Sequence, residues 1–234
     1  MREINYWISA LGMLLFSIAA CAQPPVPGQW RLTFSEDFNG NTVDWSVWQS
    51  DEGRLAILST RWPDNVSVSG GLLHLTVRKE KRGGADWTAA SIRARHFHQR
   101  YGYWEARFRY AAATGINQSF WLSGNGIEID VNEGHYPDQV NVNLHQNGQA
   151  KGIRHLVTFD PSASFHIYGC YWDEQKVIYY VDGKEVARKD GVKVDGDVFP
   201  YLSTAVATWA GPVTDAIDGK SMDVEWIHVY AQAY

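Results

Sequence analysis

The chain has 234 residues, of which 45% are hydrophobic, and a formal net charge of −5. Its length fits a single domain, and this hydrophobic fraction is enough for a large core. The negative charge argues against nucleic acid or an anionic membrane surface as the main partner, and it mildly disfavours a strongly sulfated polysaccharide unless a local basic cleft outweighs it.

The N-terminal region predicts export. The apolar stretch Ile8–Ala20 is too short to span a bilayer as a stable helix, and Cys21 follows it directly. We interpret residues 1–20 as a signal peptide of lipoprotein type with Cys21 as the lipidated first residue; a plain secretory signal is the alternative. The protein is then expected in a bacterial cell envelope, held to the membrane only through the lipid on Cys21, or secreted. Residues 21–28 are rich in proline and predict a short stiff tether.

The remaining domain, residues 29–234, contains many short strand signals and no long amphipathic helix. Leu72–Val77 follows a Gly-Gly turn, and Tyr101–Tyr110 alternates large apolar residues with charged ones. Val177–Arg188 has the pattern of a hairpin with a type I′ turn at Asp182-Gly183. Such a succession predicts an all-β fold, namely a two-sheet antiparallel β-sandwich.

The most informative strand carries three acids. Residues 126–135 place Glu128, Asp130 and Glu133 within six positions, alternating with isoleucines at first. On a regular strand Glu128 and Asp130 share a face, whereas Glu133 points to the other side. One extra residue, a β-bulge around Val131–Asn132, would return Glu133 to the same face.

Three acids on one face predict a chemistry. Repulsion between like charges raises at least one pKa, so that a proton is held at neutral pH. Cleavage of a glycosidic bond needs such a pair, one carboxylate to attack and one acid to protonate the leaving oxygen. From the spacing alone, an exposed acidic edge strand or part of a calcium site is an equally good interpretation.

The chain resembles glycoside hydrolase family 16, with the bulged Glu-x-Asp-x-x-Glu form of its signature at residues 128–133. Further segments match the family in type and order: Phe34–Gly40, Gln99–Arg107, Ser119–Leu122, Tyr171-Trp172, Val181–Gly183 and Met222–Tyr230. The resemblance implies a β-jelly roll with an open concave cleft, which suits endo-action on a polymer. It also implies that Glu128 is the nucleophile, Asp130 its electrostatic helper and Glu133 the general acid/base.

Several other residues are candidates for contact with sugar. Trp121 lies seven positions before Glu128 and is interpreted as a stacking platform, with a core position as the alternative. Asn143 and His145 share a face of the following strand, and His145 resembles a family histidine beside the acid/base; a surface histidine is the alternative. His135, directly after the acidic strand, is a weaker candidate.

A loop ahead of a strand contributes the last candidates, Arg61, Trp62 and Asn65, which are expected at the rim of the cleft. Arg61 could grip a hydroxyl, a carboxylate or a sulfate.

No cofactor is expected to be required. Family members often hold a structural calcium, for which the candidates are Glu36, the backbone of Gly71 and Glu225, although the family commonly has Asp at the last position. Motifs of metalloproteases, serine esterases and nucleotide-binding proteins are absent from the sequence.

The sequence thus predicts a retaining endo-β-glycoside hydrolase, expected as a monomer, that cleaves an extracellular polysaccharide. A β-1,3 or mixed-linkage glucan is the leading substrate, followed by galactans such as agar, porphyran or carrageenan. A carbohydrate-binding protein on the same fold is the competing hypothesis, against which the three intact acids argue.

Overall fold

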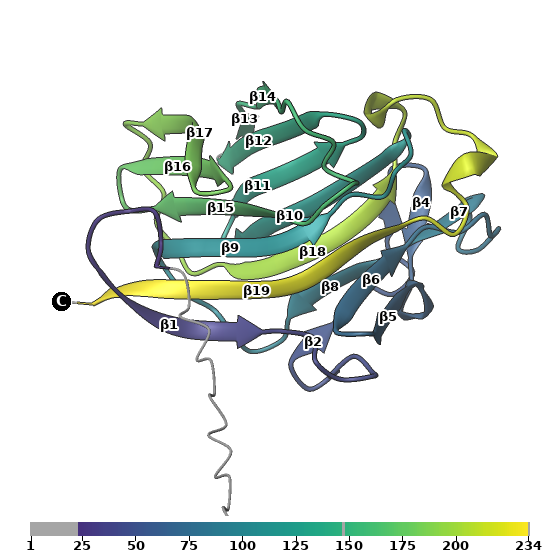
Figure 1. Ribbon diagram of the computed structural model, residues 1–234, viewed down its shortest axis with the longest axis horizontal. Helices are drawn as coiled ribbons and strands as arrows, with labels where there is room; N and C mark the ends of the chain where they lie inside the picture. Colours follow the sequence, from purple (N-terminus) through teal and green to yellow (C-terminus); the bar gives the residue numbers. More distant parts are fainter. Residues whose placement is uncertain (1–22, 147, 234) are drawn as a thin grey trace, which may run out of the picture.

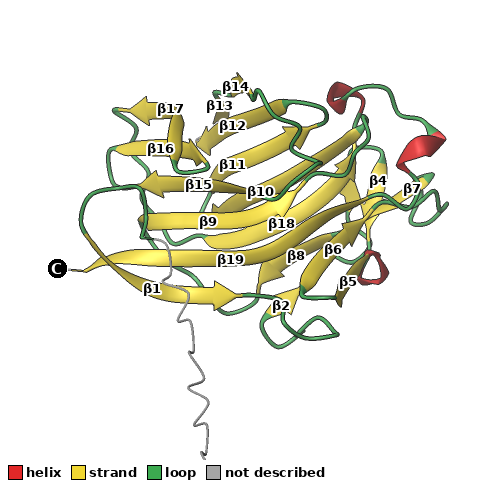
Figure 2. Cartoon of the chain, in the orientation of Figure 1, coloured by secondary structure: helices red, strands yellow, loops and turns green. Residues whose placement is uncertain are grey.

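The computed structural model describes residues 23–146 and 148–233, so the predicted signal peptide and Cys21 lie outside the described residues. The described residues form two antiparallel sheets of eight strands each, stacked face to face, and a small three-stranded sheet (Figures 1 and 2). The predicted all-β sandwich is therefore confirmed.

We name the two large sheets after their central strands. The β9 sheet has the order β17-β16-β15-β9-β19-β6-β5, with β1 also paired to β19. Its strands are β1 Gln29–Glu36, β5 Val66–Ser69, β6 Leu72–Thr76, β9 Gly102–Arg109, β15 His166–Trp172, β16 Lys176–Val181, β17 Lys184–Asp190 and β19 Ser221–Ala233.

The β11 sheet has the order β13-β12-β11-β10-β18-β8-β2, with β14 also paired to β12. Its strands are β2 Trp48–Gln49, β8 Ser91–Ala94, β10 Ile116–Gly124, β11 Ile127–His135, β12 Gln139–Gln146, β13 Gln149–Ala150, β14 Ile153–Leu156 and β18 Phe199–Val206. The small sheet consists of β3 Leu55–Ala56, β4 Ser59–Arg61 and β7 Trp87–Ala89, and the 3-10 helices are η1 Pro63–Asn65, η2 Thr208–Ala210 and η3 Asp215–Ile217.

The core lies between the two large sheets, where alternate residues of each strand point inward. Trp104 and Phe108 of β9 and Phe120 and Leu122 of β10 are fully buried in one cluster. Full burial of each such side chain stabilises the fold by about 1.5–3 kcal/mol. The residues between them therefore face outward, and on β10 and β11 this outward face carries the polar groups.

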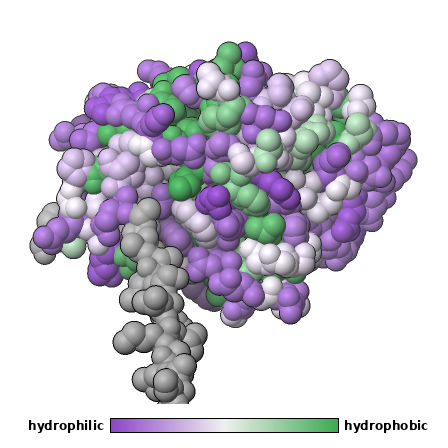
Figure 3. All heavy atoms as spheres, viewed as in Figure 1, coloured by the Kyte–Doolittle hydropathy of each residue, from purple (hydrophilic) through white to green (hydrophobic). Residues whose placement is uncertain are grey.

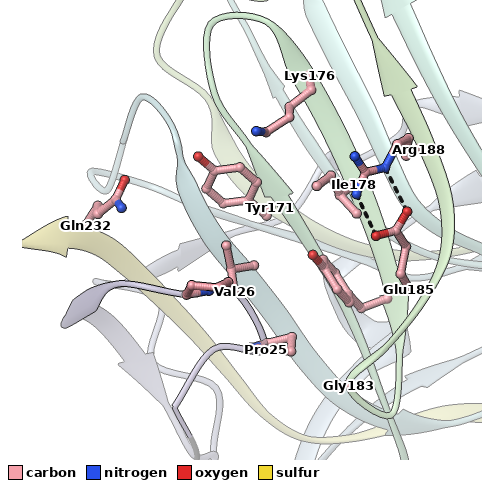
Figure 4. Close-up of a pocket in the computed structure, with 11 residues that line it drawn as sticks. Pro25, Val26, Tyr171, Lys176, Ile178, Gly183, Glu185, Arg188 and Gln232 are labelled. Atoms are coloured by element: carbon pink, nitrogen blue, oxygen red, sulfur yellow. Dashed lines mark hydrogen bonds and ion pairs between the residues drawn. The ribbon is translucent and has the colours of Figure 1, made fainter.

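The N-terminal proline segment lies against the β9 sheet. Pro24 is buried, and Trp30 Nε1 donates a hydrogen bond to Val26 O over 2.8 Å. Pro25 and Val26 help to line a pocket of about 570 Å³ on the outer face, together with Tyr171 and Lys176 (Figure 4). The described part of this segment therefore contacts the domain, and a proline side chain loses little entropy when it packs on an apolar surface.

The face of the molecule seen in Figure 3 is mostly hydrophilic, with hydrophobic residues in small scattered groups. Within residues 23–146 and 148–233, none of the helices has the length and apolar character that crossing a bilayer requires.

Candidate active site

A β-bulge in β11 brings the three acids to one face. Asp130 pairs with Asn143 and Glu133 with Asn141, so two residues of β11 lie opposite the single residue between these partners. These two, Val131 and Asn132, both point into the protein, with exposed fractions of 1% and 0%. Because they occupy the inward side together, the alternation restarts and Glu133 faces outward like the other acids.

The three acids line one groove across the β11 sheet. Glu128, Asp130 and Glu133 contribute to a pocket of about 310 Å³, and Glu128 also lines an adjoining pocket of about 330 Å³ with His145. The other residues of the first pocket are Arg54, Leu55, Ala56, Ile57, Arg61, Asn117, Ser119, Trp121 and Ser203.

Glu128 and Asp130 share a histidine. His145 Nε2 lies 3.1 Å from Asp130 Oδ2 and 3.5 Å from Glu128 Oε1. The contact with Asp130 raises the pKa of His145, whereas burial and the neighbouring Asp130 raise the pKa of Glu128. A positive imidazolium between the two carboxylates would stabilise both. The resemblance placed His145 beside the acid/base. Its direct contacts are with Asp130 and with Glu128, its partner across the strands, and the charge of Glu133 also acts on it. Asn143 Nδ2 lies 2.8 Å from His145 Nε2 and so belongs to the same cluster.

Glu133 is the acid with a pKa suited to proton transfer. Burial, followed by the charge of Asp130, raises the pKa of Glu133 to about 7. A carboxyl group with this pKa is partly protonated at neutral pH and can both donate and accept a proton.

A chain of hydrogen bonds holds Glu133 in place. Asn141 Nδ2 lies 3.1 Å from His135 Nδ1, and His135 Nε2 lies 3.1 Å from Asn117 Oδ1. Asn117 Nδ2 in turn donates to Glu133 Oε1 over 3.0 Å. Burial lowers the pKa of His135, which favours the neutral ring that this chain requires. His135 thus orients a neighbour of the acid and is itself buried, rather than open to sugar. Asn117 was missed by the sequence analysis, although it shares the outward face of β10 with Trp121, four residues further on.

Trp121 lies in the groove and not in the core. Its ring stacks on that of Tyr201, with centroids 4.0 Å apart and planes 10° from parallel. Trp121 Nε1 donates a hydrogen bond to Ser203 Oγ over 3.1 Å. The neighbouring Phe120 points into the core, as strand alternation requires. Only 8% of Trp121 is exposed, so it presents a narrow part of its ring to the groove.

Arg61 also reaches the groove, from β4. Its Nη2 donates to Ser203 Oγ over 3.1 Å, and its Nη1 lies 3.4 Å from Asp51 Oδ2. Asp51 additionally accepts a hydrogen bond of 2.7 Å from Tyr201 OH, and Arg54 and Arg93 approach it within 3.6 and 3.7 Å. Three arginines therefore surround one carboxylate, which leaves a local positive excess beside the acids. Asp51 was missed because it lies in a loop after β2, and its partner Tyr201 lies 150 residues later in the chain.

Two predicted rim residues do not line the groove. Asn65 is 1% exposed and donates to Thr76 O of β6 and Thr88 Oγ1 of β7, so its side chain joins these two strands inside the protein. Trp62 lies beneath the guanidinium of Arg82, 3.7 Å from the ring centroid, and its Nε1 donates to Thr60 Oγ1. The prediction for Asn65 is wrong, because its side chain is buried inside the protein. Trp62 is half-buried next to Arg82 and is not among the residues that line the two pockets at the acids.

The predicted calcium ligands have protein partners. The Glu36 carboxylate accepts hydrogen bonds from Phe38 N and Trp48 Nε1, and Glu225 forms an ion pair with Arg107. Gly71 lies at positive φ in the turn between β5 and β6. Because the charges of both acids already meet donors, these residues fit a calcium ion poorly.

A second set of possible metal ligands lies in the groove. Glu128, Asp130 and His145 place one ligand atom each within 4.8 Å of one another. A metal ion there would occupy Glu128, to which the family resemblance assigns the role of nucleophile, so this set does not suit a structural ion.

Comparison with known proteins decides the family. The model of glycosyl hydrolases family 16 matches residues 56–228, which is most of the described domain. The chain belongs to glycosyl hydrolases family 16. Glycosidases of this family need no cofactor.

Relatives within the family differ in what they cleave. The chain is 28% identical over 238 residues to an endo-1,3-1,4-beta-glycanase, EglC, of Rhizobium meliloti (strain 1021), covering 85% of this chain and 51% of that protein. It is 28% identical over 240 residues to a kappa-carrageenase of Pseudoalteromonas carrageenovora, covering 81% of this chain and 60% of that protein. The chain thus spans little more than half the length of these relatives.

A solved structure matches over nearly its whole length. The catalytic domain of an endo-1,3-beta-glucanase (laminarinase) from Thermotoga petrophila RKU-1 superposes with a TM-score of 0.80 at 25% identity. The match covers 89% of this chain and 100% of that domain.

Proposed function

We propose that this family 16 domain is an endo-acting, retaining β-glycoside hydrolase whose substrate is a β-1,3 or mixed-linkage glucan. The observation that carries the proposal is the outward face of β11. There a single bulge directs Glu128, Asp130 and Glu133 into one groove, and the pKa of Glu133 lies at about 7.

The acids divide the work by their surroundings. Glu128 lies 3.5 Å from His145, and a positive ring there opposes the rise in the pKa of Glu128 that burial and Asp130 cause. His145 thus helps to keep Glu128 ionised for attack on the anomeric carbon. Glu133 begins protonated and gives its proton to the departing glycosidic oxygen. In the second step Glu133 takes a proton from water, which attacks the same carbon and releases Glu128. Asp130, 5% exposed and 3.1 Å from His145, stabilises that ring throughout.

The shape of the site supports cleavage within a chain. The groove continues from the pocket at Trp121 and Arg61 into the pocket at His145 on the other side of Glu128. A polymer that crosses the strands can therefore extend past the acids in both directions. We assign Trp121 and Arg61 to one half of this path, and His145 with Asn143 to the other.

A neutral glucan is placed first because the relatives named for endo-1,3-1,4-beta-glycanase and endo-1,3-beta-glucanase activity match over most of this chain. A sulfated galactan is the second candidate. It is favoured by the relative named kappa-carrageenase and by the three arginines, Arg54, Arg61 and Arg93, around Asp51. A sulfate ester would find paired guanidinium donors there.

The cellular setting is also part of the proposal. We place the protein as a monomer in a bacterial cell envelope, lipid-anchored through Cys21, or in the medium. The apolar leader Ile8–Ala20 before Cys21 supports this location, as does a polymeric substrate too large to enter a cell.

The test is release of oligosaccharides by residues 22–234 from laminarin, lichenan, agarose and carrageenan in parallel, with Glu128→Gln as the blank. Products from laminarin or lichenan that are absent in the blank would support the leading proposal. Products from carrageenan or agarose alone would support the second candidate. Binding to a polymer without any cleavage would contradict the proposed hydrolase activity and favour the hypothesis of a carbohydrate-binding protein.

A further inference from the structure

The hairpin formed by β3 and β4 contains a strained residue. Leu55 pairs with Thr60 and Ala56 with Ser59, which leaves Ile57 and Leu58 as a two-residue turn. Ile57 has φ of 63°, and among residues 23–146 and 148–233 it is the only β-branched residue at positive φ. Glycine is the usual residue where only the first central position of such a turn has positive φ. A β-branched side chain in this conformation costs about 1–3 kcal/mol.

The turn is held firmly in this conformation. Leu58 N donates to Val206 O over 3.1 Å, and Ile57 forms a parallel bridge with Val206. Ser59 Oγ donates to Ala56 O over 3.0 Å and accepts from Val206 N over 3.1 Å. The end of β18 thus fixes the hairpin from one side, and the strain persists because these bonds oppose its relaxation.

The hairpin presents apolar side chains to solvent beside the acids. Leu55, Ile57 and Leu58 are 64%, 38% and 43% exposed. Leu55, Ala56 and Ile57 line the same pocket as Glu133 and Trp121. Both the strained backbone and the exposed aliphatic side chains lower the stability of the hairpin. Such features are typical of ligand-binding elements.

We infer that Leu55 and Ile57 form a substrate-binding wall that packs against the C–H face of a sugar unit next to the cleaved bond. This inference rests on the proposed function and assigns residues to it that the motif does not contain. Trp121 supplies an aromatic surface in the same pocket, and the aliphatic wall supplies a second apolar contact. The wall adds to the binding of the polymer, so its loss is expected in KM rather than in kcat.

The test replaces Ile57, the residue with the strained backbone. In Ile57→Gly, the new residue tolerates positive φ, so we expect the thermal midpoint of the full chain to stay equal or rise. Loss of the side chain should raise KM for the cleaved polysaccharide roughly 10-fold, which corresponds to about 1.4 kcal/mol of binding. Leu55→Ala should raise KM in the same direction, and Ile57→Asn tests whether glycine flexibility alone is responsible, because Asn also tolerates this conformation.

The matched control is Leu32→Ala, since Leu32 is 40% exposed on β1 of the β9 sheet and should leave KM unchanged. If both variants fold and their KM is unchanged, Leu55 and Ile57 do not bind substrate and the inference is wrong. If the parent cleaves nothing, the same variants are compared in the Glu128→Gln background by retardation in gels containing laminarin or carrageenan. Weaker retardation of the variants would support the role of Leu55 and Ile57 in binding and contradict the proposed hydrolase activity. No retardation of the parent would contradict both proposals.

Discussion

Asn117 Nδ2 donates a hydrogen bond of 3.0 Å to Glu133 Oε1, and this bond opposes the burial that raises the pKa of Glu133. The donor stabilises the carboxylate, whereas burial and Asp130 stabilise the acid. The pKa of about 7 is the balance of these effects. A residue outside the acidic motif therefore adjusts the group that transfers the proton.

Removing this donor should shift the pH dependence of hydrolysis. In Asn117→Ala the carboxylate of Glu133 loses a stabilising bond, so its pKa should rise further. The alkaline limb of kcat/KM against pH, which reports loss of the proton from Glu133, should move to higher pH. The acidic limb, which reports ionisation of Glu128, should stay in place. An alkaline limb that stays fixed or moves down would contradict the role of Asn117.

The raised pKa of Glu133 also makes a prediction for stability. Folding lifts its pKa from 4.5 to about 7, so the folded protein keeps a proton that the unfolded chain releases. Below pH 4.5 this group does not change the free energy of unfolding. Between pH 4.5 and 7 the free energy of unfolding falls by about 2–3 kcal/mol. Glu133→Gln should therefore raise the thermal midpoint at pH 8 and leave it almost unchanged at pH 4.

Glu105 offers a matched control for this effect. Burial likewise raises the pKa of Glu105 to about 7, but Glu105 lies on β9, in the large sheet that does not carry the three acids. Glu105→Gln should show the same pH-dependent gain in stability with full hydrolytic activity. A gain in stability at pH 4 as large as at pH 8, in either variant, would refute the linkage.

The parts that follow strand alternation were predictable from the sequence. The two faces of β9 follow from the order of apolar and charged residues, because every second side chain faces one way. The bulge in β11 was a hypothesis from the spacing of the acids, and the register shift between Asp130 and Glu133 confirms it. Asn65 was misplaced because side chains of a single 3-10 turn follow no such period, and its buried position depends on partners 11 and 23 residues away. Asp51 and the hairpin at Ile57 depend on contacts with β18, which is about 150 residues later in the chain. Such contacts leave no local pattern.

Arg61 should resist replacement by lysine. Its planar guanidinium reaches Ser203 and Asp51 at once, whereas an ammonium group can reach only one of them well. Arg61→Lys should raise KM about 10-fold, as expected when roughly 1.4 kcal/mol of binding is lost. Arg188→Lys is the control, since Arg188 forms an exposed ion pair with Glu185 on the β9 sheet. If Arg61→Lys and the parent have the same KM, Arg61 does not contribute to substrate binding.

The division of labour between the acids can be tested through the stereochemistry of the product. If Glu128 forms a covalent intermediate, proton NMR during hydrolysis should show the β anomer first, followed by slow mutarotation. Glu128→Gln should abolish release of product, because an amide cannot replace the attacking carboxylate. Glu133→Gln should lower the rate roughly 10²–10⁴-fold, with partial retention of activity on substrates whose leaving group needs no proton. Both variants should keep the parent's circular dichroism, because the two side chains face the groove and not the core. Initial formation of the α anomer would show inversion and would remove Glu128 from the role of nucleophile.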